Sequence, residues 1–262
     1  MSALRWHENK SRTHGFSHNA LVIIGMIAML LDHIAFVLIK NGKLYGYDAT
    51  LYNNAVMLPE AKMWLVLYQI LRTIGRIAFP IFALLIVEGY RKTSNVFKYM
   101  MRILLLAIIS EIPFDLMIFN EFLTKDCFNT QNVLFTYFVG LLMLVVINWM
   151  NKWPAFLTII PLVIAEVICY FLKTDYWAEG ILLIYVFYMF RHDLNLKCII
   201  AGIILFVMSF EYYKGAAIIS LFFIYLYNGQ KGYLNLKRIH YVFFPLHMLV
   251  LYAILFFTYL SK

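Results

Sequence analysis

The sequence predicts an all-α, polytopic integral membrane protein, and three observations support this fold class. The 262 residues are 63% hydrophobic and 14% charged, whereas a soluble domain is typically about 45–50% apolar and about 25% charged. The apolar residues recur along the whole chain in runs close to about 20 residues, the length that crosses a bilayer as a helix. Lys and Arg gather in the short polar stretches between these runs. We therefore expect a cytoplasmic tail at residues 1–19 and a single transmembrane domain at 20–262.

The apolar runs predict about nine transmembrane helices, of which the sixth to eighth are short and could be tilted or partly buried. Lys and Arg are more frequent in the loops on the same side as the N-terminus, so the N-terminus is predicted to be cytoplasmic. The first run is too long for the apolar core of a signal peptide and lacks a small-residue cleavage site, which favours a retained span. The expected helices are 20–39, 64–87, 98–119, 132–150, 154–172, 177–190, 196–211, 215–228 and 240–260.

The polar stretch at 40–63 is long and contains Tyr45, Tyr47 and Tyr52. Aromatic residues gather at membrane interfaces, so an interfacial belt is one interpretation, and a lid over a substrate opening is the other.

Composition argues against two other classes of site. The formal net charge is +8, but the basic residues are divided among short loops and form no continuous face of the kind that binds nucleic acid. The three cysteines include no Cys-x-x-Cys pair, so neither a disulfide framework nor a metal site is indicated. The basic loops are better explained as topology signals and contacts with anionic lipid.

The first predicted span carries Asp32 and His33 near its middle. An ionisable residue at the centre of a bilayer costs at least about 2.5 kcal/mol, so such residues usually mark a functional site. A histidine can take a proton from an amine or hydroxyl, or carry an acyl group transiently. Neighbours on a helix point about 100° apart, so Asp32 need not pair with His33 and could instead hold Arg72 or Arg76. The alternative is that Asp32 and His33 only pack two helices together.

The second predicted span contains Arg72 and Arg76, which share one helix face because they are four residues apart. Pro80 follows one turn later and is expected to kink this helix. Two interpretations stay open for the arginines. They could form ion pairs with Glu111 or Asp115, or they could act at a reaction centre or on a phosphate-bearing ligand.

Further polar residues lie within or beside the later spans. Glu111 and Asp115 share a face of the third span, where they could orient the arginines, receive an acceptor amine, or simply hold helices together. His247 follows Pro245 in the last span, where a satisfied core histidine is the alternative to a site residue. The polar residues on the predicted outer side also include Asn132, Glu166, Asp175 and Glu179.

Several stretches from the first span to the last resemble the TraX family. The most specific are Leu71-Arg-Thr-Ile-Gly-Arg-Ile-Ala-Phe-Pro-Ile-Phe-Ala83 and Ser110-Glu-Ile-Pro-Phe-Asp115. The others are Met29-Leu-Leu-Asp-His-Ile34, Val87-Glu-Gly-Tyr90, Asn132-Val-Leu-Phe-Thr136, Tyr227-Asn-Gly229 and the weaker Pro245-Leu-His247.

The best-known activity of that family is acetylation of the pilin N-terminus in conjugative plasmids. The resemblance implies a multi-pass enzyme of the inner membrane, with an architecture related to the acyltransferase-3 group. Its donor would be acetyl-CoA from the cytoplasm, and its acceptor an amine or hydroxyl reached from the extracytoplasmic side. The acceptor itself is not identified, and a homodimer is possible.

The residues expected to carry this activity fall into three groups. The catalytic group is His33, Asp32, Arg72 and Arg76. The donor-binding group is Arg102, Arg91, Lys92 and His247. The acceptor-binding group is Glu111, Asp115, Asn132 and Glu179.

Two other function classes remain open at this stage. A small-molecule or ion transporter would use buried charges and broken helices at mid-membrane in the same way, although no inverted repeat is visible. A scaffold for other membrane proteins would not explain so many charged residues within the spans.

Overall fold

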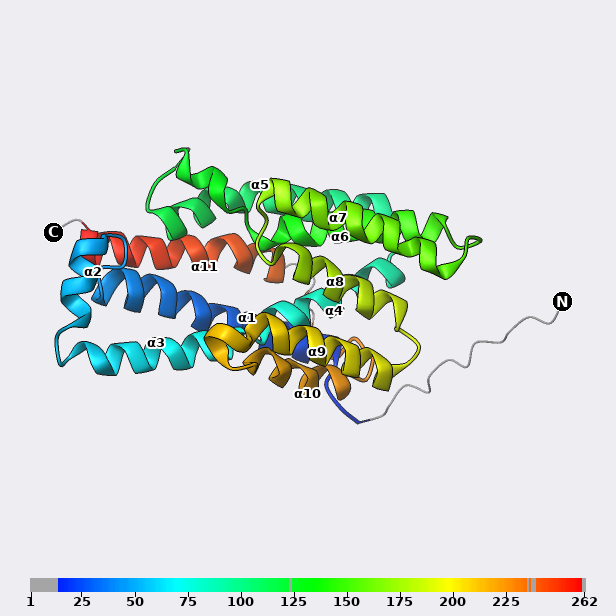
Figure 1. Cartoon of the computed structure of the whole chain (residues 1–262), viewed down its shortest axis with the longest axis horizontal. Helices are drawn as coiled ribbons and strands as arrows, with labels where there is room; N and C mark the ends of the chain where they lie inside the picture. Colours follow the sequence, from blue (N-terminus) through cyan, green and yellow to red (C-terminus); the bar gives the residue numbers. More distant parts are fainter. Residues whose placement is uncertain (1–13, 123, 235, 237–238, 261–262) are drawn as a thin grey trace.

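A computed structural model of the chain describes residues 14–122, 124–234, 236 and 239–260. In this part of the chain every regular element is a helix, and most helices follow the long axis of the molecule (Figure 1). The α-helices are α1 (His18–Ile34), α2 (Ala49–Val56), α3 (Ala61–Gly75), α4 (Ala78–Lys92), α5 (Val96–Phe119), α6 (Val133–Trp149), α7 (Ile159–Leu172), α8 (Trp177–Met189), α9 (Leu194–Tyr213), α10 (Ser220–Tyr225) and α11 (Ile239–Leu255).

Every one of the nine apolar runs is helical, which confirms the all-α prediction. By length and composition, five helical segments of the described chain qualify as membrane spans. The helices over Val133–Trp149, Trp177–Met189 and Ala216–Tyr225 are apolar but shorter. A total of nine spans and the cytoplasmic N-terminus therefore stay predictions. The five segments are His18–Lys43, Ala61–Lys92, Ala155–Leu172, Leu194–Tyr213 and Ile239–Leu260.

The second predicted span is two helices rather than one, because α3 ends at Gly75 and α4 begins at Ala78. Pro80 explains this break. It has no N–H to donate to the carbonyl of Arg76, and its ring clashes with that carbonyl, so the helix cannot run through undisturbed. The break places both arginines in or just after the last turn of α3, where the partial negative charge of the helix end stabilises cations.

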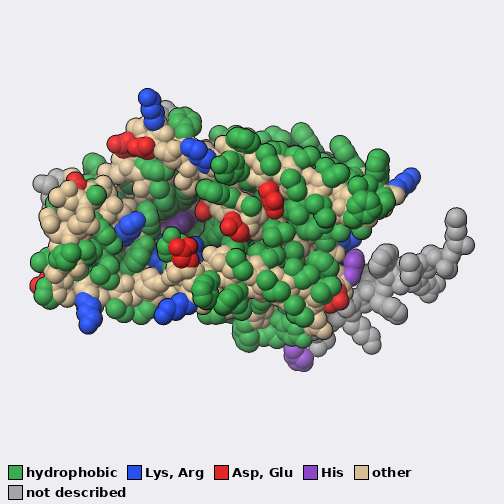
Figure 2. Space-filling view, in the orientation of Figure 1, with side chains coloured by type: hydrophobic (Ala, Val, Ile, Leu, Met, Phe, Trp, Pro, Cys, Tyr) green, Lys and Arg blue, Asp and Glu red, His purple; other side chains and the backbone are tan. Residues whose placement is uncertain are grey.

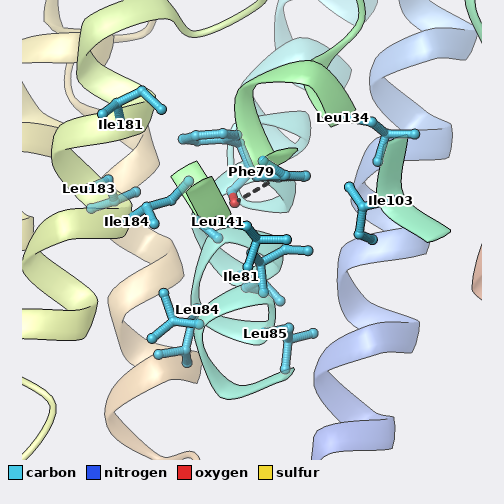
Figure 3. Close-up of a cluster of buried hydrophobic side chains, with 14 of the residues drawn as sticks. Phe79, Ile81, Leu84, Leu85, Ile103, Leu134, Leu141, Ile181, Leu183 and Ile184 are labelled. Carbon is cyan, nitrogen blue, oxygen red and sulfur yellow. Dashed lines mark hydrogen bonds between the residues drawn. The ribbon is translucent and has the colours of Figure 1, made fainter. Parts of the chain in front are cut away.

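Helix α4 lies in the centre of the hydrophobic core. Its residues from Ala78 to Val87 are nearly all buried, as expected of a helix that is apolar around its whole circumference. Figure 3 shows Phe79, Ile81 and Leu84 of α4 among side chains of α5, α6 and α8. Because the neighbouring helices pack against α4, the polar residues that they carry are held in fixed positions.

The outer surface is apolar, as a lipid-facing surface must be. Helix α7 exposes six Ile and Val side chains between Ile159 and Ile168, each at least 40% exposed. Hydrophobic side chains cover most of the face seen in Figure 2. In water such a stripe would be a liability, whereas in a bilayer it matches the solvent. Together with the candidate spans, it identifies a membrane protein.

Helix α2 was not anticipated, because the sequence indicated only a polar loop at 40–63. Asp48 begins it, and the Asp48 carboxylate accepts hydrogen bonds from the backbone N–H groups of Thr50 and Leu51 at 2.8 and 2.9 Å. This N-cap is recognisable in the sequence. The eight residues are too few to cross a membrane, so α2 links α1 to α3 outside the spans.

Candidate functional site

A cavity of about 830 Å³ lies between α1, α3, α4, α5 and α11. Helix α1 packs against α3, α4 and α11, and α11 packs against α5, so these helices form the cavity walls. The polar wall residues form two groups. The deep group is Asp32, His33, Arg72 and Arg76, and the basic group is His18, Lys92, Arg102, Lys231 and His240. His33 and His18 are about 22 Å apart along α1 at 1.5 Å per residue. Mostly apolar side chains such as Met26 and Phe82 lie between the two groups.

The deep group is organised around Asp32, whose side chain is 10% exposed. One carboxylate oxygen pairs with Nη1 of Arg72, and the other accepts from Nη2 of Arg76 at 2.6 Å. The structure thus confirms that Asp32 holds the arginines and is not a partner of His33. Both arginines are also mostly buried, at 19% and 16% exposure of their side chains. Charges in such a position need partners of opposite sign.

Aromatic side chains also contact the two arginines. Nη1 of Arg76 donates to the hydroxyl of Tyr176 at 3.2 Å, and its guanidinium lies 4.9 Å from the ring centroid of Tyr213. The guanidinium of Arg72 lies 5.7 Å from the ring centroid of Phe36. Such cation–π contacts and the Asp32 bonds fix both guanidinium groups from several sides.

Asp175 and Tyr176 reach the cavity from the loop between α7 and α8. This loop has left-handed backbone at two non-glycine residues, Lys173 (φ 52°) and Tyr176 (φ 60°), a conformation that few such residues adopt. Gln131 fixes the loop, because its N–H donates to the Lys173 carbonyl and its own carbonyl accepts from the N–H of Asp175, both at 2.9 Å. Thr136 donates to the carbonyl of Asp175 as well. Backbone strain held in this way is common at functional sites.

Gly75 provides the space that Asp32 occupies. A Cβ atom at Gly75 would overlap the Asp32 carboxylate. We expect Gly75→Ala to push Asp32 away from Arg72 and Arg76 and to lower the free energy of unfolding by about 3 kcal/mol, because it leaves buried charges without their partner. Thermal unfolding in detergent checks this. Gly202→Ala is the control, since a Cβ there would meet only a methyl group of Leu221 at 3.2 Å; an equal Tm of both variants would contradict the expectation.

His33 lies on the cavity wall, and its ring contacts a second histidine behind it. Nδ1 of His33 is 2.7 Å from Nε2 of His247 in α11. Nδ1 of His247 is in turn 2.7 Å from the carbonyl oxygen of Phe243. His247 is 6% exposed and is not part of the wall. Figure 2 shows a hollow on one face of the molecule with a histidine side chain inside it.

The basic group lines the other end of the cavity. Lys92 ends α4 there and pairs with Glu88 at 2.7 Å, and Arg102 projects from the second turn of α5. The same end of the wall also includes His18, Lys231 and His240. Arg102 and Lys231 add two cations beside the Lys92–Glu88 pair, so this end of the cavity attracts anions.

The other predicted site residues lie outside the cavity wall. Arg91 pairs with Glu88 at 3.0 Å and is not among the residues that line the cavity. Glu111 accepts bonds from the side chain and the backbone N–H of Asn132, so these two residues join α5 to the start of α6. Asp115 is buried in α5 and Glu179 is exposed on α8. Within the described chain, neither acid of α5 pairs with an arginine, so that interpretation was wrong.

Tyr176 is one of the polar wall residues that the sequence did not single out; His18, Lys231 and His240 are the others discussed above. The Tyr176 ring stacks on Phe79 at 3.9 Å between centroids and 7° between planes, while its hydroxyl meets Arg76. The sequence indicates Asp175 only as a polar residue on the predicted outer side. The one sequence signal for this loop is the run Lys173-Thr-Asp-Tyr176 between two apolar stretches, which indicates a turn but no partner.

Comparison with known proteins finds the same family that the sequence motifs resemble. The family model described as TraX protein matches residues 17–255. The chain is 25% identical to the probable fimbrial assembly protein FimC, serogroup H1, of Dichelobacter nodosus, over 262 aligned residues that cover 92% of this chain and 96% of that protein. No solved structure matches this chain.

Proposed function

This chain belongs to the TraX family, and on that basis we propose that it is a membrane-bound acetyltransferase. It moves an acetyl group from acetyl-CoA to an amine or hydroxyl of an acceptor on the extracytoplasmic side of the inner membrane. The observation that carries the proposal is the position of His33. It lies beside the Asp32–arginine cluster, on the wall of the same cavity that the basic group lines about 22 Å further along α1. A base, an anion-stabilising group and a donor site thus share one space.

His33 acts as the base. The acceptor's N–H or O–H proton passes to the imidazole while the new bond to the acetyl carbon forms, and the carbon–sulfur bond of the thioester then breaks. The released thiolate recovers the proton. Transfer through an acetyl group held on His33 for one step would use the same residue as a nucleophile.

Arg72 and Arg76 stabilise the negative charge that develops on the acetyl oxygen. Their guanidinium groups are already oriented by Asp32, so little reorganisation is needed during the reaction. Nε of Arg72 is buried and has no hydrogen-bond partner among the described residues. Asp32 is therefore a positioning residue.

The basic group binds the phosphates of the donor. We expect Lys92→Ala and Arg102→Ala to raise KM for acetyl-CoA by about tenfold each, since one charge-assisted hydrogen bond contributes roughly 1.5–3 kcal/mol. Neither change should affect S-acetylpantetheine, which has the same thioester but no phosphate. Lys152→Ala, in an exposed loop away from the cavity, is the matched control. An equal loss with both donors would contradict phosphate binding at this end.

The acceptor approaches from the side of Asp175 and Tyr176, on the predicted outer face of the bundle. The relative from Dichelobacter nodosus is named for fimbrial assembly. Subunits of surface filaments are therefore the first protein acceptors to try, although glycans with a free amine or hydroxyl fit the same chemistry.

Purified protein with acetyl-CoA tests the proposal. We expect release of free thiol, and acetylated product with a peptide bearing a free N-terminal amine or with a glucosamine acceptor, detected by mass spectrometry. In parallel, liposomes containing the protein are assayed for uptake of labelled acetyl-CoA and glucosamine. Uptake without thiol release or acetylated product would favour a transporter and overturn the proposal.

A further inference from the structure

We propose that His247 is the positioning residue that sets the protonation state of His33, and that the carbonyl of Phe243 in turn sets the state of His247. This deepens the proposed function by naming what orients its base. The starting observation is a contact between α1 and α11 at sequence positions 214 apart, with 2.7 Å between Nδ1 of His33 and Nε2 of His247.

The two rings lie in nearly one plane. Their planes differ by 5°, and their centroids are 4.9 Å apart. The centroid separation exceeds the nitrogen–nitrogen distance by about the width of one imidazole ring, so the rings meet edge to edge. This is the geometry of an in-plane N–H···N hydrogen bond, in which one nitrogen must donate and the other accept.

The direction of that bond follows from the second hydrogen bond of His247. Nδ1 of His247 is 2.7 Å from the Phe243 carbonyl oxygen, and a carbonyl can only accept. The proton is therefore on Nδ1 of His247. In a neutral imidazole the second nitrogen is then an acceptor, so Nε2 of His247 accepts from Nδ1–H of His33. Nε2 of His33 consequently carries a lone pair, which is the form that a base or nucleophile needs.

Asp32 cannot perform this role in place of His247. In many enzymes a carboxylate orients the catalytic histidine. Here both oxygens of Asp32 are bound to Arg72 and Arg76, and its side chain leaves the helix in another direction from that of His33. A neutral imidazole as the orienting group also adds no negative charge beside His33. When His33 takes a proton, His247 shares the resulting positive charge through the same hydrogen bond.

Nitrogen-15 NMR of the full-length protein with ¹⁵N-labelled histidine tests the assignment without any substrate. We expect the His33 signals, identified by their loss in His33→Gln, to show the Nδ1–H tautomer, which is the less common form of free histidine. In His247→Phe, which keeps a ring but loses the acceptor, this tautomer should no longer dominate. His247→Gln can still accept through its amide oxygen and should retain it.

Kinetics provide the second readout. His247→Phe should lower kcat for thiol release from acetyl-CoA by about 10- to 100-fold with KM unchanged, by analogy with metal-bound histidines that lose the group that orients them. His247→Gln should retain most of the kcat of the unmodified protein. His14→Phe is the control, because His14 is exposed, precedes α1 and is not among the residues that line the cavity.

The outcomes separate this inference from the proposed function. An Nε2–H tautomer at His33, or equal effects of His247→Phe and His247→Gln on the tautomer, would overturn the positioning role whether or not the protein transfers acetyl groups. The expected tautomer in a protein without thiol release would support the positioning role and contradict the acetyltransferase.

Discussion

Replacement of His33 by alanine is expected to abolish acetyl transfer, with kcat reduced by about a thousandfold or more, because general acid–base catalysis contributes roughly 10²–10⁴ and nucleophilic participation would add to this. The fold should survive, since His33 is half-buried on a cavity wall and contributes little to the core around α4. Thiol release from acetyl-CoA and acetylated product are both measured, with size-exclusion elution as the check on folding.

His14→Ala is the control for this variant, because His14 is exposed and precedes α1. It should behave as the unmodified protein does. Turnover at the normal rate in a folded His33→Ala protein would exclude His33 as base or nucleophile, and with it the proposed mechanism.

Replacement of Asp32 by alanine is expected to have the second large effect, this time on stability. It leaves Arg72 and Arg76 buried without their carboxylate partner. Removing one member of a buried ion pair typically costs about 3–5 kcal/mol. For a chain of this size, that corresponds to a fall in the apparent Tm of about 10 °C. Thermal unfolding in detergent measures it, and activity should be lost as well.

A compensated variant separates the two losses. Asp32→Ala combined with Arg72→Met and Arg76→Met removes the unpaired charges as well as the carboxylate, so most of the lost Tm should return. Activity should not return, because the oxyanion-stabilising groups are gone. If the triple variant regained activity, or Asp32→Ala left the Tm unchanged, the cluster would not have the role assigned to it.

The sequence was sufficient to identify the long apolar helices, since each depends on a local property. Apolar runs predicted every main helix, and Pro80 predicted the disturbance between α3 and α4. The second span was expected to be kinked by Pro80, and it is interrupted between Gly75 and Ala78, because the clash of a proline ring acts on the carbonyl of the residue four positions earlier. Helix α2 was missed because eight residues with a polar cap carry no span-length apolar signal.

The candidate site was predictable in its residue types but not in its pairings. Asp32, His33, Arg72 and Arg76 stood out because charges within apolar runs are costly. Which acid would meet the arginines depended on how α1 packs against α3, and nothing in a single sequence specifies that contact. The link between His33 and His247 joins the first and last spans and was equally invisible.

The loop from Lys173 to Tyr176 has a consequence for how related chains can differ in length. Its backbone is tied to Gln131 on both sides of Thr174, and two of its residues already have left-handed geometry. One added or deleted residue would shift Asp175 and Tyr176 out of register with the arginines. We therefore expect alignments of related sequences to show no gaps here, whereas the exposed turn at 150–154 should vary freely in length.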